Sequence, residues 1–251
     1  MFTSILSSII IWSAVLIIAL RVVTNSGIQF SNNKYISELT CYKGTSSNYK
    51  TTKKDILCVF LLAFSFRIIV FLFSVVIIYM FNDNINSFGD ILEQYMKWDA
   101  NNYVRIATGG YTYYTEGENF TTLAFFPLYP WLMRIVNIIF RDLRVSGLLT
   151  SFALYSGACC FLYKLFSIDY SKSVAVRAIV YMSVFPHALF FGTLMNESML
   201  LFTSAATLYY IRKHKWYLVG IWGAAAALSR MLGILLAIPA AVEWLETLQN
   251  I

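Results

Sequence analysis

Charged residues are scarce in this chain. Only 13% of its 251 residues are Asp, Glu, Lys or Arg, and 59% are hydrophobic, whereas a soluble domain carries about 25% charged residues. Long apolar runs recur from one end to the other, and in lipid such runs form helices because every backbone polar group must be satisfied internally. The composition therefore excludes an ordinary soluble enzyme and predicts an all-α polytopic membrane protein.

Cysteine and histidine are also scarce. The four cysteines show no CxxC spacing and give no disulfide framework, and the adjacent pair Cys159–Cys160 is expected to pack inside an apolar run. The two histidines, His187 and His214, have no ligand partner at helical spacing. We therefore predict neither a disulfide nor a metal site.

Several catalytic motifs are missing. The sequence has no Gly-rich phosphate loop, no HExxH and no serine nucleophile elbow. It also lacks the DxD pair with which a nucleotide-sugar enzyme would hold a metal on a diphosphate. The net charge of +6 does not indicate a nucleic-acid partner, because the basic residues lie in short segments between apolar runs, as cytoplasmic loop charges do.

The N-terminal part predicts an anchor. Residues Phe2–Leu20 form a first span, and the lysine-rich stretch from Asn25 to Lys54 is placed in the cytoplasm by the positive-inside rule. We therefore predict an N-terminal region over 1–54 and a transmembrane module over 55–251.

The second span, Ile56–Phe81, contains an arginine. Arg67 lies about 11 residues in, roughly 16 Å deep and near mid-membrane. An arginine at that depth is by default functional or paired, and the alternative is that its side chain extends to the membrane surface.

Four further spans are predicted: Val145–Phe166, Ala178–Leu194, Met199–Ile211 and Trp216–Trp244. The stretch Phe125–Phe140 is either another span or a helix on the outer surface, started by its prolines. We favour the surface helix, because both downstream basic clusters then face the cytoplasm. This choice leaves three arginines on the outer side: Arg134, Arg141 and Arg144.

The long external loop, part of an external catalytic segment over 82–145, carries the central acid. As a helix, Tyr95, Asp99, Tyr103 and Ile106 share one face, and Trp98 beside Asp99 suits the membrane–water boundary. A carboxylate on an apolar face is costly unless it is used. The alternative is that Asp99 only caps a loop helix or is solvated.

Two more charged residues are predicted to converge with Asp99. In the favoured topology Glu197 lies on the same outer side, and Arg230 is about 14 residues into the last span, roughly 21 Å from the cytoplasmic end. The alternatives are that Glu197 is a helix-end acid and that Arg230 pairs with a carbonyl or extends outward.

These residues favour a transferase that uses a lipid-linked donor. Asp99 would accept the proton of an attacking hydroxyl, while Arg230, with Arg105, would stabilise charge on a departing lipid phosphate. A single phosphate needs less neutralisation than a diphosphate, so we predict no metal and no cofactor. A non-catalytic membrane subunit is the second hypothesis, and a transporter the third.

The motifs resemble one family over roughly residues 60–245. Trp98-Asp99, Tyr103, Ile106-Ala107 and Gly110-Tyr111, followed by Phe125-Phe126-Pro127, are similar to the pattern of the PIG-V family, the GPI mannosyltransferase 2-like proteins. Later matches are Phe185-Pro186, Asn196-Glu197-Ser198 and Ser229-Arg230 with Gly233.

The resemblance implies a GT-C fold and an inverting transfer of mannose from a polyprenyl-phosphate sugar to a glycan or lipid acceptor. It implies that Asp99 is catalytic and that five residues bind substrate: Trp98, Tyr103, Arg105, Glu197 and Arg230.

The end of the chain is more similar to bacterial members, so a bacterial cell membrane is expected rather than the endoplasmic reticulum. GT-C enzymes usually continue with further spans, so this chain is expected to be a truncated product, one half of a split enzyme, or completed by a partner membrane subunit.

Overall fold

The structure, a computed structural model, describes residues 16, 51–82, 85–111 and 122–249. The chain divides into two units, Met1–Thr45 and Ser46–Ile251, and the description below concerns the second. The predicted span Phe2–Leu20 lies outside the described residues except for Leu16, and only the end of the predicted cytoplasmic loop is described. The division into an N-terminal region over 1–54 and a transmembrane module over 55–251 stays a prediction.

The described residues form helices and no strand, which confirms the predicted all-α fold. In chain order the elements are α3 (Lys53–Phe81), α4 (Phe88–Gln94), α5 (Ala100–Gly109), η1 (Thr122–Ala124), α6 (Leu128–Phe140), α7 (Leu143–Asp169), α8 (Lys172–Val184), η2 (Pro186–Gly192), α9 (Glu197–Arg212), α10 (Trp216–Ser229), η3 (Met231–Leu236) and α11 (Ala237–Gln249). Within the described residues, three stretches are long and apolar enough to cross a membrane: Lys53–Phe81, Leu143–Asp169 and Met231–Leu248.

Helix α3 corresponds to the predicted second span, Ile56–Phe81. Thr52 and Asp55 form a reciprocal capping box at its start. Only 17% of its most apolar 18-residue stretch is buried. The outward face of the helix carries large apolar side chains such as Leu72 and Phe73. Such a face requires lipid rather than water around it.

Helix α7 is the central span and packs against both α3 and α9. Its apolar window is 67% buried, and small residues such as Gly147 and Ala158 line its buried side. A Cβ at Gly147 would lie 2.8 Å from the end of the Met133 side chain, so α6 approaches α7 closely there.

The predicted span Ala178–Leu194 is broken by a sharp bend. Helix α8 ends at Val184, and η2 continues at an angle of 83° to it. The bend falls at Pro186, which has no backbone N–H to continue the helix. Arg67 of α3 donates hydrogen bonds to the Ser183 carbonyl (2.7 Å) and to the Ala188 carbonyl, on the two sides of the bend.

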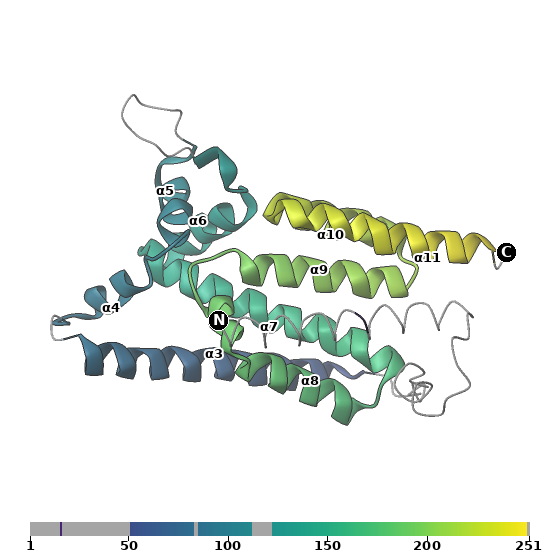
Figure 1. Ribbon diagram of the computed structural model, residues 1–251, viewed down its shortest axis with the longest axis horizontal. Helices are drawn as coiled ribbons and strands as arrows, with labels where there is room; N and C mark the ends of the chain where they lie inside the picture. The colour runs from purple at the N-terminus through teal and green to yellow at the C-terminus, as the bar shows by residue number, and fades with distance from the viewer. Residues whose placement is uncertain (1–15, 17–50, 83–84, 112–121, 250–251) are drawn as a thin grey trace. The chain divides into compact units, whose positions relative to one another are not determined.

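The predicted single span Trp216–Trp244 is wrong, because the chain reverses at Arg230. Helix α10 ends at Ser229, and η3 and α11 run back beside it, as Figure 1 shows. The return is close: a Cβ at Gly233 would lie 2.2 Å from the carbonyl carbon and oxygen of Ala226. Glycine is therefore needed at position 233 for the two arms of this hairpin to meet.

Helix α6 has 13 residues, or roughly 20 Å, against roughly 30 Å for the hydrocarbon core. It is therefore too short to span, which agrees with the surface interpretation of Phe125–Phe140. Figure 1 shows α5 and α6 together beyond one end of α9 and α10, and α6 packs on the first part of α7. The side of the membrane on which they lie stays a prediction.

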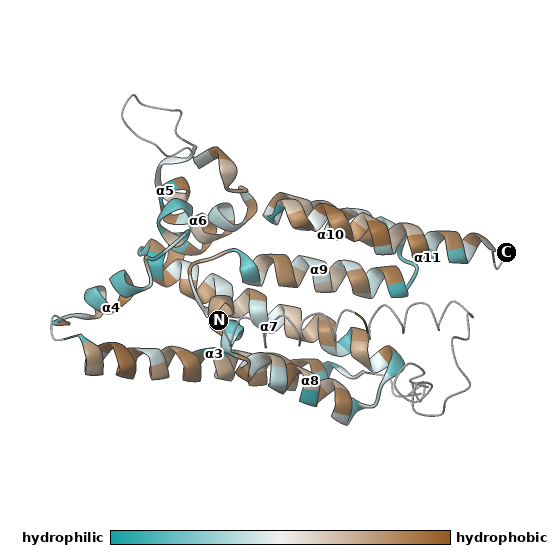
Figure 2. Ribbon diagram, in the orientation of Figure 1, coloured by the Kyte–Doolittle hydropathy of each residue, from teal (hydrophilic) through white to brown (hydrophobic). Residues whose placement is uncertain are grey.

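The two ends of the bundle differ in charge. At the end where α3, α8 and α10 begin, Lys172 pairs with Asp55 and Arg212 pairs with Asp169. We call this the basic end; it carries Lys53, Lys54, Lys172, Arg212, Lys213 and Lys215. Figure 2 shows hydrophilic residues at the helix ends and apolar residues along α3 and α10 between them. The opposite end holds α5, η2 and the turn at Arg230, and we call it the site end.

Candidate active site

Asp99 lies at the start of α5, on the site end. The predicted continuous helix through Tyr95 and Ile106 is wrong, since α4 ends at Gln94 and α5 begins at Ala100. The break includes Trp98, whose φ of 52° is left-handed. Asp99 occupies the N-cap position, but its side chain makes no capping hydrogen bond. The carboxylate is therefore not used to cap the helix.

Helix α5 is fixed by packing on α6. Tyr103 is 6% exposed, and its ring meets those of Phe125 and Tyr129 edge-on at 5.3 Å in each case. Arg134 of α6 donates to the Ala107 carbonyl at 2.8 Å, which satisfies the C-terminal end of α5. The start of α5, and with it Asp99, is thus placed by an ordered neighbour.

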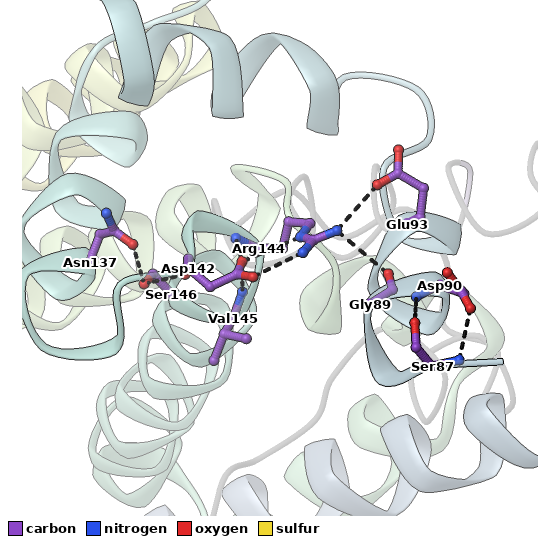
Figure 3. A network of polar contacts seen from close by, with 9 residues as sticks. All are labelled: Ser87, Gly89, Asp90, Glu93, Asn137, Asp142, Arg144, Val145 and Ser146. Atoms are coloured by element: carbon purple, nitrogen blue, oxygen red, sulfur yellow. Dashed lines mark hydrogen bonds and ion pairs between the residues drawn. The ribbon is translucent and has the colours of Figure 1, made fainter. Parts of the chain in front are cut away.

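A polar network holds the segment before Asp99. Figure 3 shows Arg144 between Asp142 and Glu93, with nitrogen–oxygen distances of 3.0 and 3.3 Å. Arg144 also donates to the Gly89 carbonyl at 3.5 Å, so the start of α7 is linked to α4. The hydrogen bond from Arg144 lowers the pKa of the Asp142 carboxyl.

Glu197 and Arg230 form an ion pair at the site end. Glu197 is the first residue of α9, and Arg230 follows the last residue of α10; their side chains meet at 2.8 Å. The neighbouring Asn196, 2% exposed, donates from its side-chain amide to the Ser229 carbonyl, which fixes the turn against α9. The structure therefore brings together two residues that lie 33 positions apart in the sequence.

A cavity of about 500 Å³ lies at this end. It is lined by Trp98, Asp99, His187, Phe190, Phe191, Met195 and Glu197. Asp99 and Glu197 are its two carboxylates, and Arg230 lies behind Glu197 as its partner. Trp98 is 67% exposed and its ring lies 5.6 Å from that of Phe190, so one wall is aromatic.

The hydroxyl of Tyr103 is affected by burial and by the site charges. Burial raises the pKa of its hydroxyl far above the ordinary value, and the carboxylates of Glu197 and Asp99 raise it further. Arg230 and the amide of Asn196 oppose this rise. Tyr103 therefore stays protonated at neutral pH.

The predicted site residues divide into three groups. Trp98, Asp99 and Glu197 line the cavity. Tyr103 and Arg230 are not lining residues, but Arg230 pairs with the lining residue Glu197. Arg105 is exposed on α5 and is not among the lining residues. Their roles stay predictions.

Sequence reasoning missed four lining residues: His187, Phe190, Phe191 and Met195. The signal that could have indicated His187 is the neighbouring Pro186, which predicts a break in the helix there. Among the described residues no group of three or more His, Cys, Asp or Glu side chains could hold a metal ion.

Fold and site together define a helical membrane protein with an acidic and aromatic cavity at one end of its bundle. Residues 126–248, just under half of the chain, match the family model of the dolichyl-phosphate-mannose-protein mannosyltransferases. The match includes Glu197 and Arg230 and begins after Asp99. It supports a membrane glycosyltransferase of the broad GT-C class and of mannosyltransferase type, and it does not single out the PIG-V family. No curated protein and no solved structure matches the chain.

Proposed function

We propose that this protein transfers a sugar, mannose by resemblance, from a polyprenyl-phosphate donor to a hydroxyl of a glycan or lipid acceptor at the outer side of the membrane. A bacterial cell membrane is the proposed location. The observation that carries the proposal is the cavity at the site end, where Asp99 and the Glu197–Arg230 pair meet. The match to the mannosyltransferase family model supports the reaction class.

Asp99 is the proposed general base. The acceptor oxygen forms a bond to C1 of the sugar as the bond from C1 to the phosphate oxygen breaks, and its electron pair leaves with the phosphate. The hydroxyl proton passes to the Asp99 carboxylate, which is exposed at the cavity and takes no part in capping α5. Attack opposite the leaving group inverts C1, as the resemblance implies.

Arg230 is the proposed partner of the leaving phosphate. A guanidinium binds phosphate oxygens through paired N–H donors. Its contact with Glu197 holds it beside the cavity, and the Arg230 side chain remains 43% exposed. The phosphate would share this guanidinium with Glu197, which is why a metal and a cofactor are not required by the proposal.

The donor lipid would reach the cavity from the bilayer. Exposed aromatic side chains at the site end, Trp98 and Phe185, suit the region between headgroups and acyl chains. Trp98 and Phe190 offer flat apolar surfaces to the sugar ring. A partner membrane subunit that completes the donor site is part of the same proposal.

The test is sugar transfer from a polyprenyl-phosphate donor by the purified full chain and by Asp99→Asn. We expect the variant to lose about a hundredfold or more in rate, since an amide cannot accept the proton. Asp169→Asn, which alters a carboxylate at the basic end, is the matched control and should retain the rate. Unchanged transfer by Asp99→Asn would remove the catalytic assignment, and no transfer by the intact chain would favour the non-catalytic subunit.

A further inference from the structure

The residues that line the cavity supply no permanent cation to a phosphate. Two of its lining residues, Asp99 and Glu197, carry carboxylates. Arg230 is not a lining residue and is already paired with Glu197 at 2.8 Å. A lipid-linked phosphate entering this space therefore meets two negative charges and one guanidinium that is shared.

His187 is the only lining residue in the described part of the chain that can become a cation. It is exposed, and its ring lies between those of Phe185 and Phe190, at 5.9 and 6.0 Å. Neither of its ring nitrogens has a hydrogen-bond partner among the described residues. The imidazole is thus held at the cavity by its aromatic neighbours while its polar atoms stay available.

The backbone that carries His187 is fixed. The next residue, Ala188, accepts a hydrogen bond from Arg67 through its carbonyl. At the other end of η2, the Ser198 hydroxyl donates to the Phe191 carbonyl at 2.8 Å. The imidazole is therefore presented from an anchored turn, as a binding group requires.

We propose that protonated His187 donates a hydrogen bond to the phosphate of the lipid-linked donor, so that the donor binds more tightly as the pH falls. This inference rests on the proposed function and identifies a donor-binding residue that the sequence did not reveal. Histidine is the side chain whose charge changes between about pH 5 and pH 8. A hydrogen bond to a charged partner is about twice as strong as a neutral one.

Charged groups of both signs surround His187. Asp99 from α5 and Glu197 from α9 line the same cavity. The nearby cations are Arg67 of α3, which contacts the Ala188 carbonyl, and Arg230, which pairs with Glu197. From α7, Tyr155 lies under the Arg67 guanidinium at 4.4 Å and is a neutral phenol. Lys97 lines a neighbouring cavity of about 190 Å³, and Trp98 lines both cavities.

The test measures binding rather than turnover. The probe is farnesyl methyl phosphate, a phosphodiester whose single negative charge is constant over the range, titrated into the full chain in phosphatidylcholine nanodiscs at about pH 6 and about pH 8. We expect the wild-type Kd to be about tenfold lower at the lower pH. His187→Gln should show the weaker Kd at both values, and His187→Lys the tighter Kd at both.

The second histidine is the matched control. His214 lies at the basic end, beside Glu243 and Thr247, and His214→Gln should bind the probe as the wild type does. Loss of the pH dependence in His214→Gln or Lys97→Gln, or its persistence in His187→Gln, would overturn the proposal.

The two proposals fail separately. Probe binding that depends on His187, in a chain that transfers no sugar, would support the phosphate site and contradict the enzymatic function. Transfer that requires Asp99 but has a pH-independent donor KM in wild type and His187→Gln alike would contradict only the role of His187.

Discussion

Arg67 shows what a single residue can indicate in a membrane sequence. Its position near mid-membrane predicted a paired or functional side chain, and the structure shows it 1% exposed, bonded to carbonyls and stacked over the Tyr155 ring. The sequence could not name these partners, because they are backbone groups that only the break at Pro186 releases. For this buried arginine, the partners are the backbone carbonyls that the helix break leaves without a donor.

Replacing Arg67 should destabilise the fold rather than alter chemistry directly. We expect Arg67→Met to lower the free energy of unfolding by about 3 kcal/mol, because two buried carbonyls lose their donor. Denaturant unfolding in detergent measures this. Arg177→Met, an exposed arginine of α8 that bonds only within its own helix, is the control and should change stability little. Equal stabilities for the two variants would contradict the structural role of Arg67.

At the scale of the element, the hairpin of α10 and α11 shows where hydropathy is insufficient. Trp216–Trp244 is apolar nearly throughout, so a hydropathy pattern reads it as one long span. Hydropathy carries no information on direction, whereas the reversal depends on the extended backbone of Arg230 and on the close approach at Gly233. Arg230 was predicted to lie about 14 residues into the span that begins at Trp216. It does so, because helix α10 runs for 14 residues from Trp216 and Arg230 follows its last residue.

Gly233→Ala should open this hairpin. A Cβ there would overlap backbone atoms of α10, which cannot rotate away as a side chain does. We expect a loss of about 1–3 kcal/mol in unfolding free energy, together with reduced sugar transfer as Arg230 moves away from Glu197. Gly220→Ala, also in this hairpin but with nothing within 4 Å of the new Cβ, should be neutral or slightly stabilising. If both variants kept wild-type stability, the close packing of the hairpin would be refuted.

At the scale of the whole molecule, the helical class followed from composition alone, and the gathering of Asp99, Glu197 and Arg230 at one end followed from counting residues along predicted spans. The cavity could not be predicted, because Trp98 and Phe190 approach each other only through the break before α5 and the bend before η2. His187 was missed for the same reason.

The separation of the basic end from the site end predicts their sidedness. In a background in which the four natural cysteines are replaced, Asn101→Cys at the site end should react with a membrane-impermeant maleimide in intact cells. Lys213→Cys at the basic end should react only after permeabilisation, because the basic cluster is retained inside. The reverse pattern would place the site in the cytoplasm and remove the proposed outer-side reaction.

The 83° turn after α8 and the guanidinium beside it are mutually dependent. Without the bend, Arg67 would be a buried charge with no acceptors, and without Arg67 the bend would leave two buried carbonyls without this donor. Positions 67 and 186 are therefore expected to vary in concert across related chains, where loss of one residue is tolerated only alongside loss of the other.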